Sequence, residues 1–136
     1  MTLWKSARTL VVVVLLAATQ FAAAGCGDSP SHDDLSRILD SYPLPPSFRQ
    51  VSAKEYTFSD GDSGGGVNTV SRYFESGEVG IDPRAAVRGA LASRGVEIRD
   101  SAEDVRLGRI STEYEGVNVV VFAGDEPIEV RAYKLV

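Results

Sequence analysis

The fold is decided by residues 107–135, LGRISTEYEGVNVVVFAGDEPIEVRAYKL. Apolar and polar residues alternate along Leu107–Tyr114 and again along Ile128–Leu135, which is the period of a half-buried strand. Between them, Val117–Ala123 is nearly all apolar, which indicates a central strand covered on both faces. Short turns separate these strands, the first at Glu115-Gly116, and such turns can join only antiparallel neighbours. The stretch therefore predicts three consecutive antiparallel strands.

Two more strands are predicted upstream, over residues 50–58 and 67–75. The segment SDGDSGGG at 59–66 joins them, so they should pair as an antiparallel hairpin with a long loop. Within the first of these strands, the apolar side chains change face between Ala53 and Tyr56, which indicates a β-bulge.

Two helices are predicted from their start and stop signals. Ser31 followed by Asp34 is close to a capping box, and Asp82-Pro83 supplies an N-cap and a proline in the first turn. Pro43 ends the first helix, and Gly95 ends the second as a left-handed residue. Each helix carries one apolar stripe, formed by Leu35, Ile38, Leu39 and Tyr42 in the first and by Ala86, Val87, Ala90 and Leu91 in the second.

The predicted order is helix, strand, strand, helix, strand, strand, strand (α-β-β-α-β-β-β). We expect residues 31–136 to form a single α+β domain of two layers. In it, a five-stranded, mostly antiparallel sheet has one main helix packed on one face, with a short N-terminal helix in addition. Small folds of this class host many unrelated functions, so the architecture itself predicts none.

The beginning of the chain has the three parts of an export signal. Lys5 and Arg8 form a short positive region, and Leu10–Ala18 (LVVVVLLAA) is an unbroken apolar run. A membrane-spanning helix needs about 20 apolar residues, so this run is too short to span. We expect residues 1–25 to be removed as a signal peptide.

Cys26 is the only cysteine and follows directly after Ala23-Ala24-Gly25. These four residues resemble the lipobox of bacterial lipoproteins, in which the first position is usually a larger aliphatic residue than Ala23. The resemblance covers residues 1–28 only. It implies that Cys26 carries a diacylglyceryl group, that the leader is cut before it, and that the new amino terminus is often acylated too. It thus implies membrane lipid as a partner through Cys26, residues 26–30 as lipidated cysteine and short tether, and a location on the extracytoplasmic side of the cell membrane.

A second cleavage route remains open. Ala22 and Ala24 also fit the A-x-A pattern of an ordinary signal peptidase, which would release a soluble secreted protein starting near Gly25. However, a lone cysteine in an exported protein is a reactive thiol that calls for explanation. Lipidation consumes that thiol, which favours the lipoprotein interpretation.

The mature chain is acidic. Removal of Lys5 and Arg8 leaves 14 − 2 = 12 basic residues against 19 acidic ones, a net charge of 12 − 19 = −7. This balance argues against nucleic acid as a partner, because nucleic-acid binding needs clustered Lys and Arg. It also argues against surface charge as the main anchor to anionic lipid.

The loop Asp60-Gly61-Asp62-Ser63-Gly64 is the best candidate for a metal site. Alternating carboxylates can present oxygens to calcium, and glycine allows the sharp turn that such loops need. The series stops after two carboxylates and lacks a closing glutamate, so a solvated hairpin loop is favoured. Asp60 and Asp62 are therefore only weak candidates for metal ligands, and no cofactor is expected.

Two other sets of residues are candidates for binding or catalysis. Arg84, Arg88 and Arg94 lie along the second predicted helix, where they could meet a phosphate or an acidic partner. Surface ion pairs on the wet side of an amphipathic helix are favoured instead. His32 is the only histidine, and neither a metal site nor a hydroxyl nucleophile can be assembled around it. We expect it to be an exposed residue of the first helical turn.

Two carboxylate pairs are present, Glu103 with Asp104 and Glu113 with Glu115. Such pairs can perform acid–base chemistry if their surroundings split their pKa values, but the predicted turn at Glu115 should keep the second pair solvated. The strand aromatics are expected in the core or in cross-strand pairs before they form a binding platform. They are Tyr56, Tyr73, Phe74, Tyr114 and Phe122.

No catalytic residue is assigned from the sequence. We expect a membrane-anchored, non-enzymatic module of the bacterial envelope that binds an envelope protein or a small ligand. The alternatives are a soluble secreted protein of the same fold, a small carboxylate-dependent envelope enzyme and a calcium-dependent binding domain.

Overall fold

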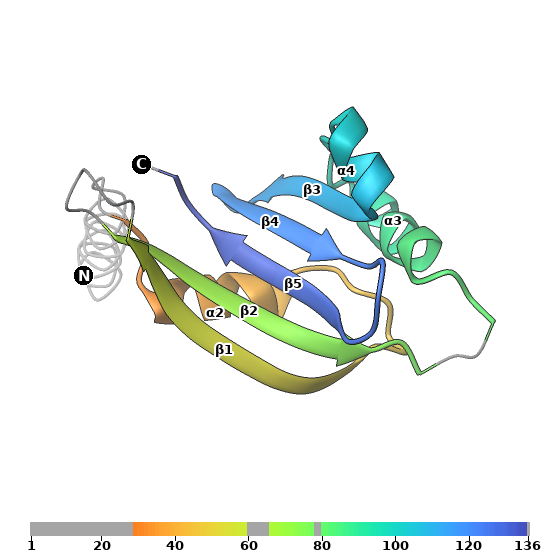
Figure 1. Cartoon of the computed structure of the whole chain (residues 1–136), viewed down its shortest axis with the longest axis horizontal. Helices are drawn as coiled ribbons and strands as arrows, with labels where there is room; N and C mark the ends of the chain where they lie inside the picture. Colours follow the sequence, from red (N-terminus) through yellow and green to blue (C-terminus); the bar gives the residue numbers. More distant parts are fainter. Residues whose placement is uncertain (1–28, 60–65, 78–79, 136) are drawn as a thin grey trace, which may run out of the picture.

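In the described residues, five antiparallel strands form one sheet in the order β1-β2-β5-β4-β3 (Figure 1). The computed structural model describes residues 29–59, 66–77 and 80–135, so Cys26, Asp60 and Asp62 lie outside the described part. The predicted α+β class and the predicted order of elements are confirmed, and one further helix, α4, precedes β3. The elements are α2 (His32–Ser41), β1 (Arg49–Ser59), β2 (Gly66–Glu75), α3 (Pro83–Ser93), α4 (Ala102–Leu107), β3 (Arg109–Tyr114), β4 (Val117–Phe122) and β5 (Ile128–Tyr133).

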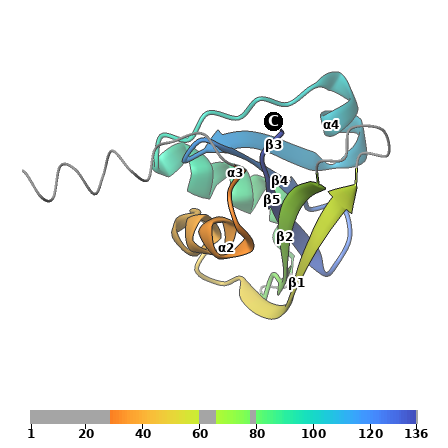
Figure 2. The same cartoon turned by 90° about the vertical axis from the view of Figure 1, so that its left-hand side faces the viewer.

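Two helices cover one face of the sheet. Figure 2 shows α2 and α3 on the same side of it. The two helices have nearly equal lengths, 10 and 11 residues. The helical layer therefore consists of two helices of similar size, α2 and α3. Leu35 of α2 and Leu91 of α3 are fully buried, because each lies on an apolar stripe that meets the strands. The fully buried strand residues beneath them are Val70, Ile110, Val119, Val121, Ile128, Val130 and Ala132.

One side-chain hydrogen bond is buried inside this core. The Tyr42 hydroxyl lies 2.8 Å from Oγ1 of Thr112, and that Oγ1 also lies 3.0 Å from the carbonyl oxygen of Val119. Because a carbonyl can only accept, the Thr112 proton is donated to Val119, and Tyr42 must donate to Thr112. Burial raises the pKa of Tyr42 to about 12, so this donor keeps its proton near neutral pH.

The predicted helix boundaries are confirmed. Ser31 and Asp34 form a reciprocal capping box, with both hydrogen bonds at 3.1 Å. Asp82 caps α3 by accepting a hydrogen bond of 3.0 Å from the amide of Arg84, and Pro83 occupies the first turn. Gly95 follows α3 with a φ of +71°, the left-handed conformation expected after a helix end.

The turns and the bulge follow local backbone preferences. Glu115 and Gly116 both have positive φ, 51° and 78°, which suits the twist of the β3–β4 hairpin. A bulge interrupts the pairing of β1 with β2, as the sequence predicts, but it lies between Gln50 and Ser52, nearer to the start of the strand.

Helix α4 is the element that the sequence analysis missed. Ser101 and Asp104 form a second capping box, and Gly108 ends the helix in the left-handed conformation. The strand predicted from Leu107 therefore begins only at Arg109. The helix escaped detection because it has six residues and no buried apolar stripe, with Leu107 48% exposed.

Gly108 offers a test of this junction. A Cβ at this position would lie 3.3 Å from the Cα of Gly124, and the residue has a φ of +71°. Gly108→Ala should therefore lower the free energy of unfolding by about 1–2 kcal/mol, which urea titration measures.

The matched control is Gly89→Ala inside α3, where nothing lies within 4 Å of the added methyl group. It should raise the free energy of unfolding by up to about 1 kcal/mol, because alanine favours the helix. Changes of the same sign in both variants would contradict the assignment of Gly108 as a left-handed cap.

Candidate functional site

The face of the sheet turned away from α2 and α3 carries a groove of about 580 Å³, and we call this side the groove face. Val119 and Val121 point into the core, so the alternation of a strand places Val120 and Phe122 on the groove face. This volume lies within the range of about 300–1,000 Å³ that is usual for small-ligand pockets. The lining residues are Phe58, Val67, Asp104, Arg109, Ser111, Val120, Phe122, Arg131, Tyr133 and Leu135.

The strand β4 forms the floor of the groove. It is second from the edge of the sheet, and α2 and α3 cover only one of its faces, while the short α4 lies at one end of the groove on the other. The expectation of a central strand is confirmed, but only one face of β4 is covered by the two long helices, and the other carries the groove. Val120 is only 9% exposed although it lies on the groove face, which is why the strand is apolar on both sides.

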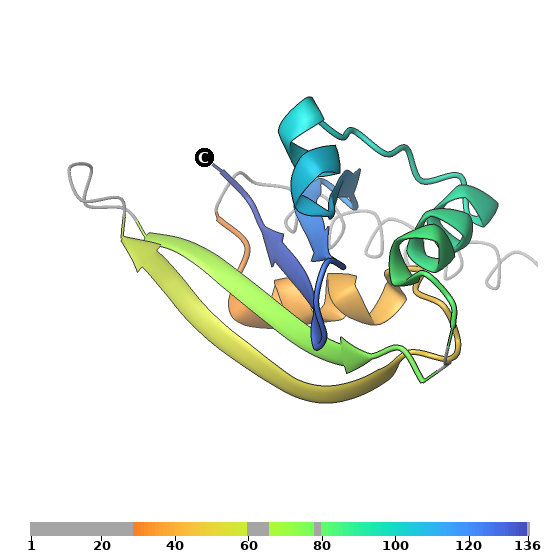
Figure 3. The ribbon, with the colours of Figure 1, turned by 45° about the vertical axis from the view of Figure 1, so that its right-hand side comes forward.

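One end of the groove is apolar. Phe58 of β1 pairs directly with Val67 of β2, and Leu135 follows the end of β5. Phe58 and Leu135 are 52% and 68% exposed, which is high for side chains of this kind. The views in Figures 1 and 3 place the end of β5, the end of β1 and the start of the described chain at the same end of the domain.

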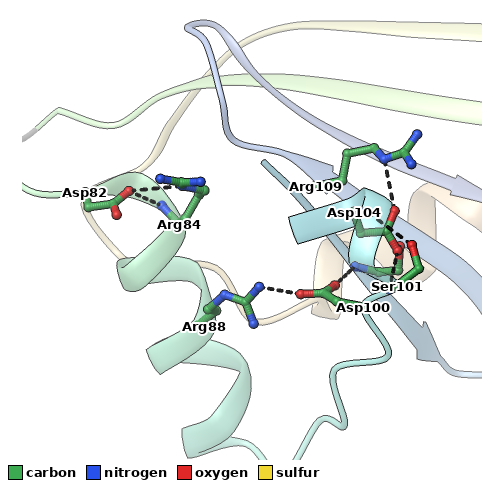
Figure 4. A network of polar contacts seen from close by, with 8 residues as sticks. Asp82, Arg84, Arg88, Asp100, Ser101, Asp104 and Arg109 are labelled. Atoms are coloured by element: carbon green, nitrogen blue, oxygen red, sulfur yellow. Dashed lines mark hydrogen bonds and ion pairs between the residues drawn. The ribbon is translucent and has the colours of Figure 1, made fainter. Parts of the chain in front are cut away.

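The opposite end of the groove is polar and is organised by Asp104 of α4 (Figure 4). Its carboxylate accepts hydrogen bonds from the Ser101 amide at 2.9 Å and from the Ser111 hydroxyl at 3.0 Å. Nε of Arg109 lies 3.0 Å from Asp104, but its N–H is not aligned for a hydrogen bond, so this contact is an ion pair. The hydrogen bond from Ser101 is the main cause that lowers the pKa of Asp104, and Ser111 and Arg109 add to it.

A second ion pair lies on the same face, on β5. Glu129 accepts a hydrogen bond of 2.7 Å from Nε of Arg131 and one of 2.9 Å from the Ser71 hydroxyl. The Arg131 guanidinium lies over the Phe122 ring, 4.6 Å from its centroid. Burial alone would lower the pKa of Arg131, but its hydrogen bond to Glu129 and the charge of Glu129 raise it above the ordinary value. Both arginines of the groove are thus already paired with carboxylates.

The three arginines of α3, expected to form ion pairs on a solvated helix surface, differ in their surroundings. Arg84 pairs with Asp82 at 3.6 Å at the start of the helix, and Arg94 is exposed at its end. Arg88 instead pairs with Asp100, whose side chain is only 8% exposed and also accepts a hydrogen bond of 2.8 Å from the Ser111 amide (Figure 4). Arg88 thus ties α3 to the segment before α4 and to β3.

The other candidate residues are not brought into one site. His32 is half-buried rather than exposed, because its Nε2 forms a hydrogen bond of 2.9 Å with the Tyr56 carbonyl. Glu103 and Asp104 have separate partners, since Glu103 is exposed and lies 3.9 Å from Arg106. Glu113 pairs with Arg99 at 2.7 Å, and Glu115 lies in the exposed turn.

The strand aromatics divide between the two faces. Phe74 and Tyr114 lie on the core side, where Tyr114 packs edge-to-face on Tyr42 with ring centroids 5.2 Å apart. Phe122 lines the groove, and cross-strand pairing places Tyr73 on the same face through Glu129. Tyr56 belongs there too, since its hydroxyl lies 3.4 Å from Oγ of Ser71. The expectation of a core or cross-strand position is thus met in the core by Phe74 and Tyr114, whereas the other three lie outside the core, and the alternation of the strands is the signal that separates them.

This arrangement is suited to binding rather than to acid–base chemistry. Ser111 donates to Asp104, but a carboxylate with a lowered pKa is a weak base. A serine nucleophile also needs a positioned base such as histidine, and His32 is occupied with the Tyr56 carbonyl. Among the described residues, no group of three or more His, Cys, Asp or Glu side chains could hold a metal ion.

Asp104 should make stability depend on pH. Its pKa is lower in the folded state than in the unfolded state, so it stabilises the fold above the unfolded pKa of about 4 and loses this effect as the pH falls through the folded pKa. Asp104→Asn should lower the free energy of unfolding by about 1–2 kcal/mol at pH 7, with a smaller difference below pH 4. Urea titrations at several pH values measure this.

Glu103→Gln, one residue away on α4, is the matched control. Its exposed contact with Arg106 is worth at most about 0.5 kcal/mol, so stability should hardly change. An Asp104→Asn deficit that stays constant from pH 7 to pH 3 would contradict the role given to the Asp104 charge.

Comparison of the chain with protein-family models, curated proteins and solved structures gave no match. In residues 29–59, 66–77 and 80–135, no helix is long and apolar enough to cross a membrane. The function must therefore be inferred from the groove and from the leader sequence.

Proposed function

We propose that this protein is a lipoprotein of the bacterial envelope, anchored through Cys26, and that its domain is a non-enzymatic module that binds a small ligand. The groove is the observation that carries the binding role. It combines an apolar floor and an apolar end with a few convergent polar groups, which is the usual composition of a ligand site. Its polar groups are hydrogen-bonded pairs, which can orient a ligand but do not supply an activated nucleophile.

The position at which the described chain begins is compatible with an anchor at Cys26. The carbonyl of Pro30 accepts a hydrogen bond of 3.1 Å from Nδ2 of Asn68 on β2. This contact holds the beginning of the domain against the sheet. The four residue steps from Cys26 to Pro30 can span at most about 14 Å. A lipid on Cys26 would therefore hold this end of the domain close to the membrane surface.

The chemistry of the mature chain favours a lipid over a charged patch as the anchor. Its net charge of 12 − 19 = −7 would be repelled by an anionic leaflet. A diacylglyceryl group supplies two chains, and two chains anchor stably where one binds only marginally. The lone thiol of Cys26 is the group that such a modification requires.

Replacing Cys26 tests the anchor. The wild-type protein should sediment with the membranes, and Cys26→Ser should appear in the soluble fraction, because serine cannot form the thioether. Immunoblots of the two fractions measure this. Mass spectrometry of the mature amino-terminal peptide should show the added diacylglyceryl mass on Cys26 in the wild type.

Ser29→Ala is the matched control near the same site and should remain with the membranes. An amino-terminal peptide that begins before Cys26, or that carries an unmodified thiol, would refute the anchor and leave the soluble secreted alternative. Membrane association of Cys26→Ser equal to that of the wild type would refute it as well.

The binding role is tested with the dye anilinonaphthalene sulfonate, which fluoresces on apolar surfaces. The folded protein should bind it at one saturable site, and Tyr133→Ala should weaken the binding several-fold, because Tyr133 lines the groove. Tyr114→Ala is the control, since Tyr114 is also half-buried but packs on the core side. Equal weakening by both variants, at a temperature where both are folded, would refute the groove as the site.

A further inference from the structure

We propose that the groove holds one acyl chain of a lipid taken from the adjoining membrane, with the tail at the Phe58–Leu135 end and the head group at the Arg109 end. This inference rests on the proposed function and names the ligand class of the same groove. Three observations lead to it: the order of apolar and polar groups along the groove, the donors at its polar end, and the end of the domain at which its apolar part opens.

The groove changes from apolar to polar along its length. The pairing of the strands sets this order on the groove face, because Phe58 and Val67 lie at one end of the sheet and Arg109 pairs with Phe122 near the other. Val120 lies on the floor between the two ends. A ligand that matches this order has an apolar tail and a polar head.

Arg109 at the polar end and Arg131 beside Val120 in the middle of the groove can donate hydrogen bonds to a head group. Arg109 and Arg131 use Nε in their ion pairs, and their terminal guanidinium nitrogens make no hydrogen bond with other described residues. These nitrogens only donate, so they suit the oxygen acceptors of a carboxylate or ester. Asp104 and Glu129 neutralise the two charges, so orientation of the head, rather than strong attraction of an anion, is what this end provides.

The apolar end opens beside the start of the domain. Pro30 is hydrogen-bonded to Asn68, which is next to Val67 on β2. Because Cys26 is four residues from Pro30, a membrane anchor on Cys26 would lie within about 14 Å of Pro30. Asn68 lies on the helix side of β2 and Val67 on the groove side, so the anchor and the apolar end of the groove share one end of the sheet but lie on opposite faces of it. A lipid that enters the groove head-first would leave its tail on the membrane side, where Phe58 and Leu135 are 52% and 68% exposed. Burial of these side chains by an acyl chain would remove apolar surface from water.

Palmitate and butyrate are probes that share a head group and differ in chain length. The exported protein carrying Cys26→Ser is used, so that no attached lipid competes, and calorimetric titration measures binding below the micelle concentration. Palmitate should bind at a single site at least a hundredfold more tightly than butyrate, because each buried methylene adds about fourfold.

Two variant pairs locate the tail and the head. The double variant Phe58→Ser/Leu135→Ser should weaken palmitate binding about tenfold, whereas Val51→Ser/Val105→Ser, also at exposed apolar residues but outside the groove, should leave it unchanged. Arg109→Gln should weaken it a few-fold, whereas Arg84→Gln on α3 should not.

Equal affinities for palmitate and butyrate, or equal losses in a groove variant and its control, would overturn the lipid assignment. If palmitate does not bind while the dye still binds at the groove, the lipid assignment fails and the binding module stands. If the wild type carries no lipid on Cys26, the anchor fails whatever palmitate does, so the two proposals are separately refutable.

Discussion

The structure depends on the alternation of side chains across the three-strand block β2-β5-β4. Val70, Ala132 and Val119 form one row that faces the helices, and the adjacent row of Ser71, Arg131 and Val120 faces the groove. A slip of one residue in either pairing would exchange the two sets, placing Arg131 in the core. The charge of Arg131 could not be accommodated there without a partner, so the register is strongly specified. The core and the groove are thus two consequences of one register.

The groove face is partly buried although no long helix covers it. Thr69 and Ser71 are fully buried on this face, and each makes a hydrogen bond, Ser71 with Glu129 and Thr69 with the Val67 carbonyl. Buried polar groups need such partners, because an unpaired one costs about 1–3 kcal/mol. The polar residues of this face are therefore held in fixed geometry before any ligand binds. Such preorganisation lowers the entropy lost on binding.

The sequence contains most of the fold but little of the groove. The strands and the β3–β4 turn could be predicted because alternation and the Glu115-Gly116 pair are local signals. Helix α4 could have been found from Ser101 and Asp104, which repeat the spacing of Ser31 and Asp34 that did predict α2. Its brevity and lack of an apolar stripe hid it.

The groove could not be predicted because its lining comes from β1, β2, β3, β4, β5 and α4, and only the non-local pairing brings them together. The alternation of side chains along β4 predicts that Val120 and Phe122 share a face, but it does not predict which strands lie beside them. Similarly, the hydrogen bond of His32 to the Tyr56 carbonyl joins residues that are 24 positions apart. No local pattern predicts such a contact, so the sequence alone predicted that His32 is exposed.

The edge strand β1 bears on whether the groove stays accessible. Within the described residues it pairs only with β2, so its other side is the place where a second copy could add to the sheet. If β1 strands from two copies paired symmetrically and antiparallel, each residue would lie opposite a residue of the same face. A pairing centred on the middle of β1 would then place Lys54 opposite Lys54, or Glu55 opposite Glu55. Like charges directly opposite are destabilising, and the bulge beside Ser52 further disturbs the edge. Self-association through β1 is thus disfavoured, which leaves the neighbouring apolar end of the groove accessible to a ligand.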